Sequence, residues 1–159
     1  MLNLKNLASS VIIYEEGFRS RPYYCSENYP TIGYGFKLGP RNTPLTHYQF
    51  SMTQEVAKVW LSELIDKVIA DMLRCPIIKA AWDNSNDARK SILVSMAYQM
   101  GIDGLSSFSG FLGAARMGNW LKAHDEMLDS LWSKQTTKRA NRHATQFQNG
   151  SFNSCYLAA

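Results

Sequence analysis

The strongest constraint on the fold is a long stretch of helical spacing that follows Thr53. Apolar residues recur there every four positions in two neighbouring rows: Val56, Trp60, Leu64, Val68 and Met72, then Leu61, Ile65, Ile69 and Leu73. Two adjacent rows at this period predict a helix that is buried along most of its length. Thr53 suits the N-cap position, Glu55 places negative charge in the first turn, and Pro76 marks the end.

The segments on either side of this helix differ in character. Residues 2–16 have helical spacing and are followed by a glycine, which is typical of helix ends. Residues 18–46 are rich in Tyr, Gly, Pro, Thr and Asn, and the alternation in residues 31–36 predicts a short strand with one bulky and one nearly bare face. A helix at about 87–100, ending at Gly101, and several shorter helices follow.

These patterns indicate an α+β protein that is mostly α. We expect one domain over residues 1–159, with a small N-lobe of about 13–52 that contains a β-hairpin. The helix over 2–16 would pack on the C-lobe, and the linking helix and the helical C-lobe would occupy 53–159. A cleft between two lobes is a usual place for a ligand site.

Composition excludes several classes of protein. The chain has 17 Lys+Arg against 13 Asp+Glu, a net charge of +4, and no apolar run reaches the ~18 residues of a membrane-spanning helix. Its N-terminal residues lack the apolar centre and cleavage site of a signal peptide. Three cysteines, Cys25, Cys75 and Cys155, predict free thiols in a reducing compartment. Neither the cysteines nor the scattered histidines have metal-ligand spacing, so no metal and no cofactor are expected.

Glu16 is a candidate acid because it ends the first helix and faces the β-containing segment. Alone, it reads as a solvated glutamate beside Glu15. The neighbouring charge and the negative end of the helix dipole would favour the protonated form of a buried carboxyl here, which suits a general acid for glycosidic cleavage. Gly33 and Gly35 would let a sugar ring approach. Five aromatic residues surround them: Tyr23, Tyr24, Tyr29, Tyr34 and Phe36. These offer either a surface for sugars or a small hydrophobic core.

Motifs along the chain resemble those of the phage-type lysozymes, glycoside hydrolase family 24. Glu16, eight residues, Cys25, five residues and Thr31 match the family pattern of E, eight residues, D or C, five residues and T. The resemblance continues in order through Tyr98-Gln99-Met100-Gly101 and again over residues 132–142. It covers nearly the whole chain.

The resemblance implies a lysozyme-like fold and an N-acetylmuramidase. Such an enzyme hydrolyses the β-1,4 bond between N-acetylmuramic acid and N-acetylglucosamine in bacterial peptidoglycan. Glu16 would be the catalytic general acid, and Thr31 with Cys25 would hold the attacking water, which gives inversion at the anomeric carbon. Cys25 stands where the type member of the family has an aspartate. Direct attack by its sulfur would instead form a covalent intermediate and retain the configuration.

The resemblance also assigns substrate contacts. Tyr98 and Gln99 match a pair that faces the cleft from the C-lobe. Lys37 and Phe111 fall at two further contact positions, although neither residue type is kept, and Gly35 bares the backbone to the sugar. Residues 36–52 form a shorter segment than in the family, so a helix of the N-lobe is expected to be missing or reduced.

A basic stripe lies near the C-terminus of the sequence. Lys134, Lys138 and Arg142 recur every four residues, with Arg139 beside them. The stripe is either a solvated helix face or a surface that attracts the anionic wall, and the second reading predicts activity that falls as salt rises.

The resemblance implies an endolysin for host cell lysis and phage release. It would accumulate in the cytoplasm of the infected bacterium and reach the peptidoglycan glycan strands from the periplasm once a separate holin has permeabilised the membrane. We expect a monomer without nucleic-acid partner or stable membrane anchor. A virion-associated lysozyme is less favoured, because the chain starts at Met1 and has the length of one domain. Two alternatives are a non-catalytic basic module that binds wall polymer or nucleic acid, and a scaffold that has lost catalysis through Cys25.

Overall fold

The computed structural model describes residues 3–158. Its elements follow one another along the chain as α1 (Leu4–Glu16), β1 (Arg19–Tyr24), β2 (Pro30–Gly33), β3 (Phe36–Lys37), η1 (Leu45–His47), α2 (Gln54–Arg74), α3 (Pro76–Asp83), α4 (Asp87–Ser106), α5 (Ser109–Arg116), α6 (Trp120–Leu128), α7 (Leu131–Gln135), α8 (Thr137–Asn149) and η2 (Ser154–Tyr156). The protein is therefore mostly helical with one small sheet, which confirms the predicted α+β class.

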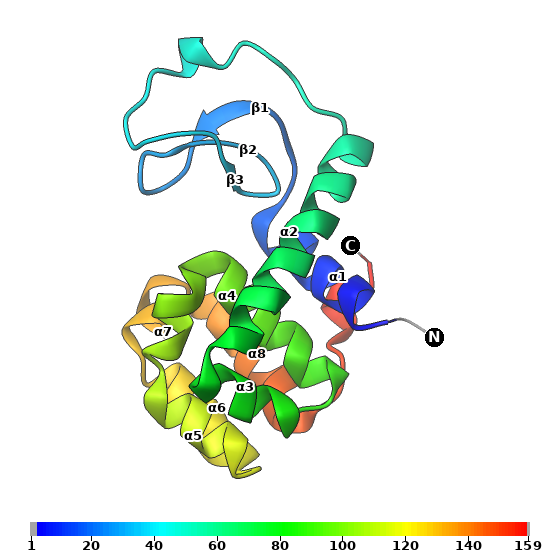
Figure 1. The fold of residues 1–159 in the computed structure, drawn as a ribbon, viewed down its shortest axis with the longest axis vertical. Helices are drawn as coiled ribbons and strands as arrows, with labels where there is room; N and C mark the ends of the chain where they lie inside the picture. Colours follow the sequence, from blue (N-terminus) through cyan, green and yellow to red (C-terminus); the bar gives the residue numbers. More distant parts are fainter. Residues whose placement is uncertain (1–2, 159) are drawn as a thin grey trace.

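Helix α2 connects the sheet to the helical body (Figure 1). The three strands lie at one end of the molecule, and α2 runs from that end down to the cluster formed by α3–α8. Helix α1 packs against α4 and α2, so the N-terminal helix belongs to the helical side. Within residues 3–158, no helix combines the length and the apolar character needed to cross a membrane.

The predicted helix ends are confirmed where the sequence carries capping residues. Thr53 caps α2 by accepting a hydrogen bond from the backbone of Val56 at 3.3 Å, and Cys75 ends the helix directly before the proline that starts α3. Gly17 ends α1 with a φ of 65°. Gly101 interrupts α4 with a φ of 76°, a backbone conformation that favours glycine.

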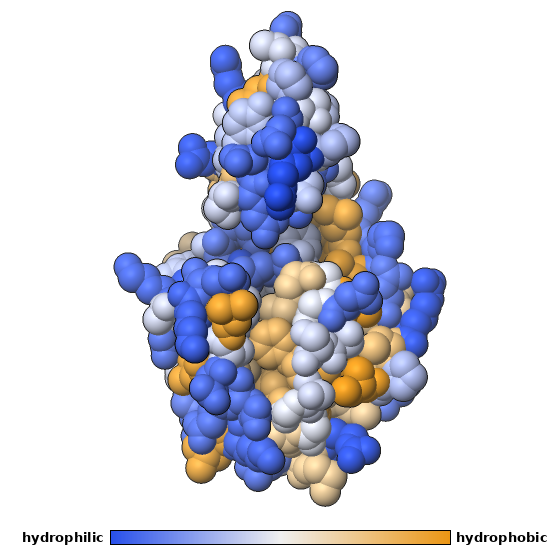
Figure 2. Space-filling model, turned by 90° about the vertical axis from the view of Figure 1, so that its left-hand side faces the viewer, coloured by the Kyte–Doolittle hydropathy of each residue, from blue (hydrophilic) through white to orange (hydrophobic). Residues whose placement is uncertain are grey.

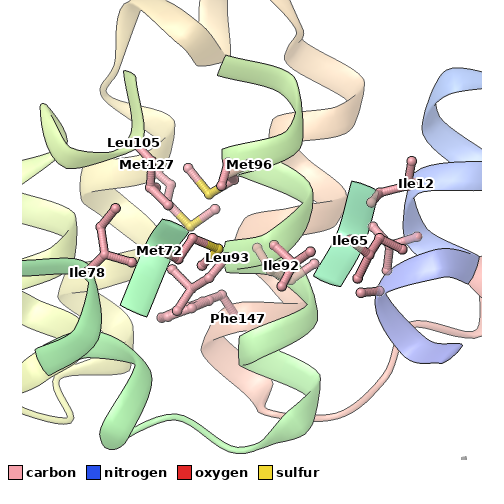
Figure 3. Close-up of a cluster of buried hydrophobic side chains, with 14 of the residues drawn as sticks. Ile12, Ile65, Met72, Ile78, Ile92, Leu93, Met96, Leu105, Met127 and Phe147 are labelled. Carbon is pink, nitrogen blue, oxygen red and sulfur yellow. The ribbon is translucent and has the colours of Figure 1, made fainter. Parts of the chain in front are cut away.

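The core joins helices from both ends of the chain (Figure 3). Its labelled side chains come from α1, α2, α3, α4, α6 and α8: Ile12, Ile65, Met72, Ile78, Ile92, Leu93, Met96, Leu105, Met127 and Phe147. Burying each large apolar side chain contributes about 1.5–3 kcal/mol. Both rows predicted to be buried on α2 are partly wrong at one end, since Val56 is 55% and Leu73 37% exposed.

The sheet is antiparallel with strand order β1-β2-β3. The sequence predicts a single strand over residues 31–36, and this is wrong: β2 ends at Gly33, and β3 begins at Phe36 after a turn. Gly33 and Gly35 have φ values of 64° and 77°, so they reverse the chain rather than form a bare strand face. A Cβ on Gly33 would lie 2.5 Å from the ring of Phe36, so this glycine makes room for the small core.

The aromatic residues of this lobe divide between the two expected roles. Tyr34 and Phe36 are buried, and the Phe36 ring lies 4.6 Å from that of Trp60 on α2. Tyr24 is exposed, and Tyr23 and Tyr29 are half-buried. Between β3 and α2 the chain forms only the three-residue turn η1, which agrees with the expected loss of a helix there.

Candidate active site

The site is built around Glu16, the last residue of α1. Its side chain is 22% exposed, and its Oε1 accepts a hydrogen bond from Nη1 of Arg139 at 2.8 Å. Arg139 lies on α8, is only 8% exposed, and is separated from Glu16 by 123 positions in the sequence. The general acid candidate is therefore held by a buried cation that comes from the far end of the chain.

The turn between β2 and β3 covers the other side of this carboxyl. A Cβ on Gly35 would lie 3.0 Å from Oε2 of Glu16, so a glycine is needed for this close approach. The hydroxyl of Tyr98 on α4 donates to the backbone oxygen of Tyr34 at 2.6 Å and anchors the turn to the helical body. Burial, and next the negative charge of Glu16, raise the pKa of Tyr98, which therefore stays protonated and able to donate.

Thr31 lies in β2 of the sheet, and Cys25 lies at the end of the neighbouring strand β1. Tyr23 on β1 pairs with Thr31 on β2, and Cys25 follows directly after β1. Burial raises the pKa of the Tyr23 phenol most, and the charge of Glu16 raises it further, with a smaller effect of Cys25. Tyr23 thus feels both the carboxyl and the thiol, which brings the three predicted catalytic residues into one neighbourhood.

The Cys25 thiol is half-buried and polarised by its surroundings. Burial raises its pKa, but hydrogen bonds from the backbone of Tyr29 and Glu27 and from the Thr31 hydroxyl outweigh that effect, so the pKa lies below its ordinary value. The charge of Lys37 acts in the same direction. The Thr31 hydroxyl has a single proton, which it donates to the backbone oxygen of Tyr29 at 2.8 Å, so it serves only one of these two acceptors at a time.

The residues predicted to contact substrate fall into different places. Lys37 is exposed, with its Nζ 4.0 Å from the centre of the Tyr29 ring and 3.7 Å from Glu27. Gln99 is half-buried, and its Oε1 accepts a hydrogen bond from Nε1 of Trp132 at 2.9 Å.

Phe111 requires a correction. It borders a groove of about 400 Å³ on the helical body, but it is 1% exposed and packs its ring 4.8 Å from that of Phe147. The predicted contact of the Phe111 side chain with substrate is therefore wrong for this structure, in which the ring belongs to the core.

The predicted basic stripe is also corrected. Lys134 lies on α7 and Lys138 on α8, and both are exposed. Arg142 instead donates two hydrogen bonds to the carboxylate of Glu15, at 2.9 and 2.7 Å, and Arg139 binds Glu16. The two arginines thus form ion pairs with the two glutamates and are not part of a solvated face.

Arg139 is the functional residue that sequence reasoning missed. The signal was present in the spacing of α8, because Arg139, His143 and Gln146 fall on the same helix face as the apolar Ala140 and Phe147, and all five are buried. A charged residue on a buried face requires a partner of opposite charge.

The sheet and the helical body meet at a hollowed part of the surface (Figure 2). Glu16 stands at the end of α1, where the chain passes from the helical body into the sheet, and the sheet's turn and α4 meet at its carboxyl. A carboxyl group that can give a proton, next to residues that can hold water, serves glycosidic cleavage.

Fold and site together place the chain among the lysozyme-like glycoside hydrolases. The sequence model of the phage lysozyme family matches residues 14–145. The chain belongs to this family.

Three relatives are similar to the chain over different spans. The chain is 32% identical over 148 residues to the pre-baseplate central spike protein Gp5 of Enterobacteria phage T4, which covers 80% of this chain and 25% of that protein. It is 25% identical over 157 residues to probable T4-type lysozyme 1 of Dictyostelium discoideum, covering 88% and 92% of the two chains. With probable T4-type lysozyme 2 of the same organism it shares 32% identity over 74 residues, or 46% of this chain and 44% of that one. The chain thus spans only a quarter of the spike protein.

Proposed function

We propose that the chain is a muramidase that hydrolyses the β-1,4 bond between N-acetylmuramic acid and N-acetylglucosamine in bacterial peptidoglycan. The observation that carries this proposal is the asymmetric environment of the Glu16 carboxyl. Arg139 holds Oε1, while Oε2 faces the Gly35 turn. A proton on Oε2 can pass to the glycosidic oxygen as the bond breaks, which is the task of the general acid.

The second half of the reaction requires a nucleophile on the opposite face of the sugar. Thr31 and Cys25 are the proposed ligands of the attacking water, because a hydroxyl oxygen and a polarised sulfur both accept hydrogen bonds. This route inverts the anomeric configuration. Anomeric NMR of the first product formed from purified glycan strands tests it, and an initial product of retained configuration would favour attack by the Cys25 sulfur instead.

The proposed setting is that of an endolysin. The chain would act on the glycan strands of the wall as a monomer, after accumulating in the cytoplasm of the infected bacterium and passing a membrane opened by a separate holin. Its net charge of +4 supports attraction to an anionic wall. Lysis of permeabilised cells should then weaken as ionic strength rises.

The decisive experiment compares Glu16 with a second glutamate, Glu27, which follows β1. Glu16→Gln should keep the fold and lower the clearing of permeabilised Gram-negative cells by about 10²–10⁴-fold, since the general acid is lost. Glu27→Gln is the matched control, because Glu27 is exposed and 3.7 Å from Lys37, and it should clear cells like the wild type.

The same comparison separates the alternatives. Clearing that survives Glu16→Gln would contradict the proposal. Salt-sensitive binding to wall or nucleic acid without any clearing would favour the non-catalytic basic module. An inactive wild type that regains activity in Cys25→Asp would indicate that the cysteine has disabled the enzyme.

A second setting for the same chemistry is local opening of the wall during entry of a phage. The similarity to a central spike protein supports this candidate. Peptides of the chain in purified virions would favour the spike setting, whereas a chain found only in infected cells would favour the endolysin.

A further inference from the structure

The guanidinium of Arg139 is held from behind by a serine on α4. Its Nη2 donates to Oγ of Ser95 at 3.0 Å and lies 3.4 Å from the backbone oxygen of the same residue. Its Nε is buried without a hydrogen-bond partner among the described residues. Because one donor is already unsatisfied, the orientation of this buried cation depends strongly on the contacts it does make, to Ser95 and Glu16.

The Ser95 hydroxyl is in turn bound to a histidine that lies wholly inside the protein. Oγ of Ser95 is 2.9 Å from Nε2 of His143, and Nδ1 of His143 is 3.0 Å from the hydroxyl of Tyr156. Burial lowers the pKa of His143 well below its ordinary value, and the charges of Arg139 and Arg142 lower it further. The ring is therefore neutral at pH 7 and carries a single N–H.

The position of that N–H follows from Tyr156. The tyrosine hydroxyl is 2.7 Å from Oε1 of Glu15, and the carboxylate there has no proton to give, so Tyr156 is the donor. Its oxygen must then accept a hydrogen bond from Nδ1 of His143. Nε2 is left as an acceptor, and the Ser95 hydroxyl donates a hydrogen bond to it. The oxygen of that hydroxyl remains free to accept a hydrogen bond from Arg139.

We propose that Ser95 and His143 are positioning residues for catalysis, with His143 held as the Nδ1–H tautomer. The histidine orients the serine hydroxyl, and the serine oxygen orients Arg139. Arg139 then holds Oε1 of Glu16 and leaves Oε2 toward the turn of the sheet. The catalytic part of this inference rests on the proposed function, whereas the tautomer does not.

The first test uses two serines on successive turns of α4. Ser91 and Ser95 are both fully buried, and each accepts a side-chain hydrogen bond from α8: Ser91 from Gln146, and Ser95 from Arg139. Ser95→Ala should lower kcat on soluble peptidoglycan fragments about tenfold and leave KM within about twofold, because it misplaces the acid without touching substrate. Ser91→Ala should lose stability and keep the kcat of the wild type.

Equal kcat values for Ser95→Ala, Ser91→Ala and the wild type would overturn the positioning role. An equal fall in both variants would also overturn it, since a loss of packing in α4 would then explain both. If the wild type cleaves peptidoglycan and Glu16→Gln does not, either result counts against the positioning role alone and leaves the proposed function intact.

The second test needs neither a variant nor an activity. Long-range ¹H–¹⁵N NMR of the wild-type protein at pH 7 distinguishes the two neutral tautomers of a histidine. A protonated Nδ1 and an unprotonated Nε2 on His143 are expected. A protonated Nε2 would make Ser95 an acceptor from the histidine and would overturn the proposed orientation.

Discussion

Glu15 and Glu16 are consecutive residues that meet two different environments at the end of α1. Glu15 is 3% exposed, and both of its oxygens are bound: Arg142 donates to each, and Tyr156 donates to Oε1. Glu16 is 22% exposed and receives one hydrogen bond from Arg139 on Oε1, while Oε2 has no hydrogen-bond partner among the described residues. Both arginines come from α8.

The difference shows how one helix end can provide both a structural and a chemical carboxylate. Consecutive residues of a helix point about 100° apart, so one side chain enters the core and the other faces the sheet. A carboxylate whose oxygens are all bound contributes to stability and has no free oxygen to offer a substrate. A carboxyl with one free oxygen does have one to offer, and its arginine orients it.

The largest expected effect comes from removing the arginine of the buried pair. Arg142→Met leaves Glu15 buried with only the Tyr156 hydroxyl, and it should lower the free energy of unfolding by about 3–5 kcal/mol. Arg139→Met should cost less stability, because water can reach Glu16. Urea denaturation of both variants measures the difference. A greater loss of unfolding free energy for Arg139→Met would contradict the distinction between the buried Glu15–Arg142 pair and the more exposed Glu16–Arg139 pair.

A substitution in the turn between β2 and β3 tests whether the close approach of Gly35 to Glu16 matters for activity. Gly35→Ala places a methyl group 3.0 Å from Oε2 of Glu16 at a φ of 77°, so it should cost about 1–2 kcal/mol of stability and also lower kcat. Gly101→Ala is the matched control, since Gly101 has a φ of 76° with no atom within 4 Å of the added Cβ. The two variants should lose similar stability in thermal melts, and only Gly35→Ala should lose activity. Equal activity in both would show that the close approach at Glu16 has no catalytic consequence.

The surroundings of the buried pair predict a dependence of stability on pH. His143 lies 3.8 Å from Glu15, and its pKa is far below that of a histidine in an unfolded chain, which is about 6.5. As the pH falls below about 6.5, the unfolded chain binds a proton that the folded protein does not, so stability falls by up to about 1.4 kcal/mol per pH unit. Urea midpoints at pH 7.5 and 5.5 measure this, with His143→Phe as the reference. An equal decline in both proteins would assign the effect to other groups.

The smallest effect concerns two thiols that report on the two neighbourhoods. The pKa of Cys25 is lowered by the hydrogen bonds it receives, which outweigh burial, whereas burial raises the pKa of Cys155 near Glu15 and Arg142. Cys25 should therefore react with iodoacetamide at lower pH than Cys155, because the thiolate is the reacting form. Peptide mass spectrometry over a pH series follows both sites. The reverse order would contradict the proposed polarisation of Cys25.

The sequence was sufficient for elements whose ends carry local signals. Thr53 and the residues before Pro76 define α2, and the glycines at 17 and 101 mark the breaks after α1 and within α4. A hairpin was expected in this lobe, but the position of strand β1 was not predicted, because its residues show no alternation and it exists through pairing with β2. For the same reason, the sequence predicted a single strand over residues 31–36, where the chain in fact reverses at Gly33 and Gly35.

The site was predictable in part for the same reason. Glu16, Cys25 and Thr31 lie within one short segment, so their register could be read from the sequence. The partners that decide what each carboxylate does lie on α8, more than 120 positions away, and no local pattern specifies such a contact. The predicted substrate contact of Phe111 was wrong because a matching position does not determine whether a different side chain points outward or into the core.

The long separation between Glu16 and Arg139 also bears on synthesis. α1 leaves the ribosome first, but its carboxyl can be oriented only after α8 has been made and has packed beneath it. A nascent chain shorter than about 140 residues would carry Glu16 without the cation that orients it. The carboxyl of Glu16 therefore acquires its orientation only near the end of translation, and incomplete chains lack it.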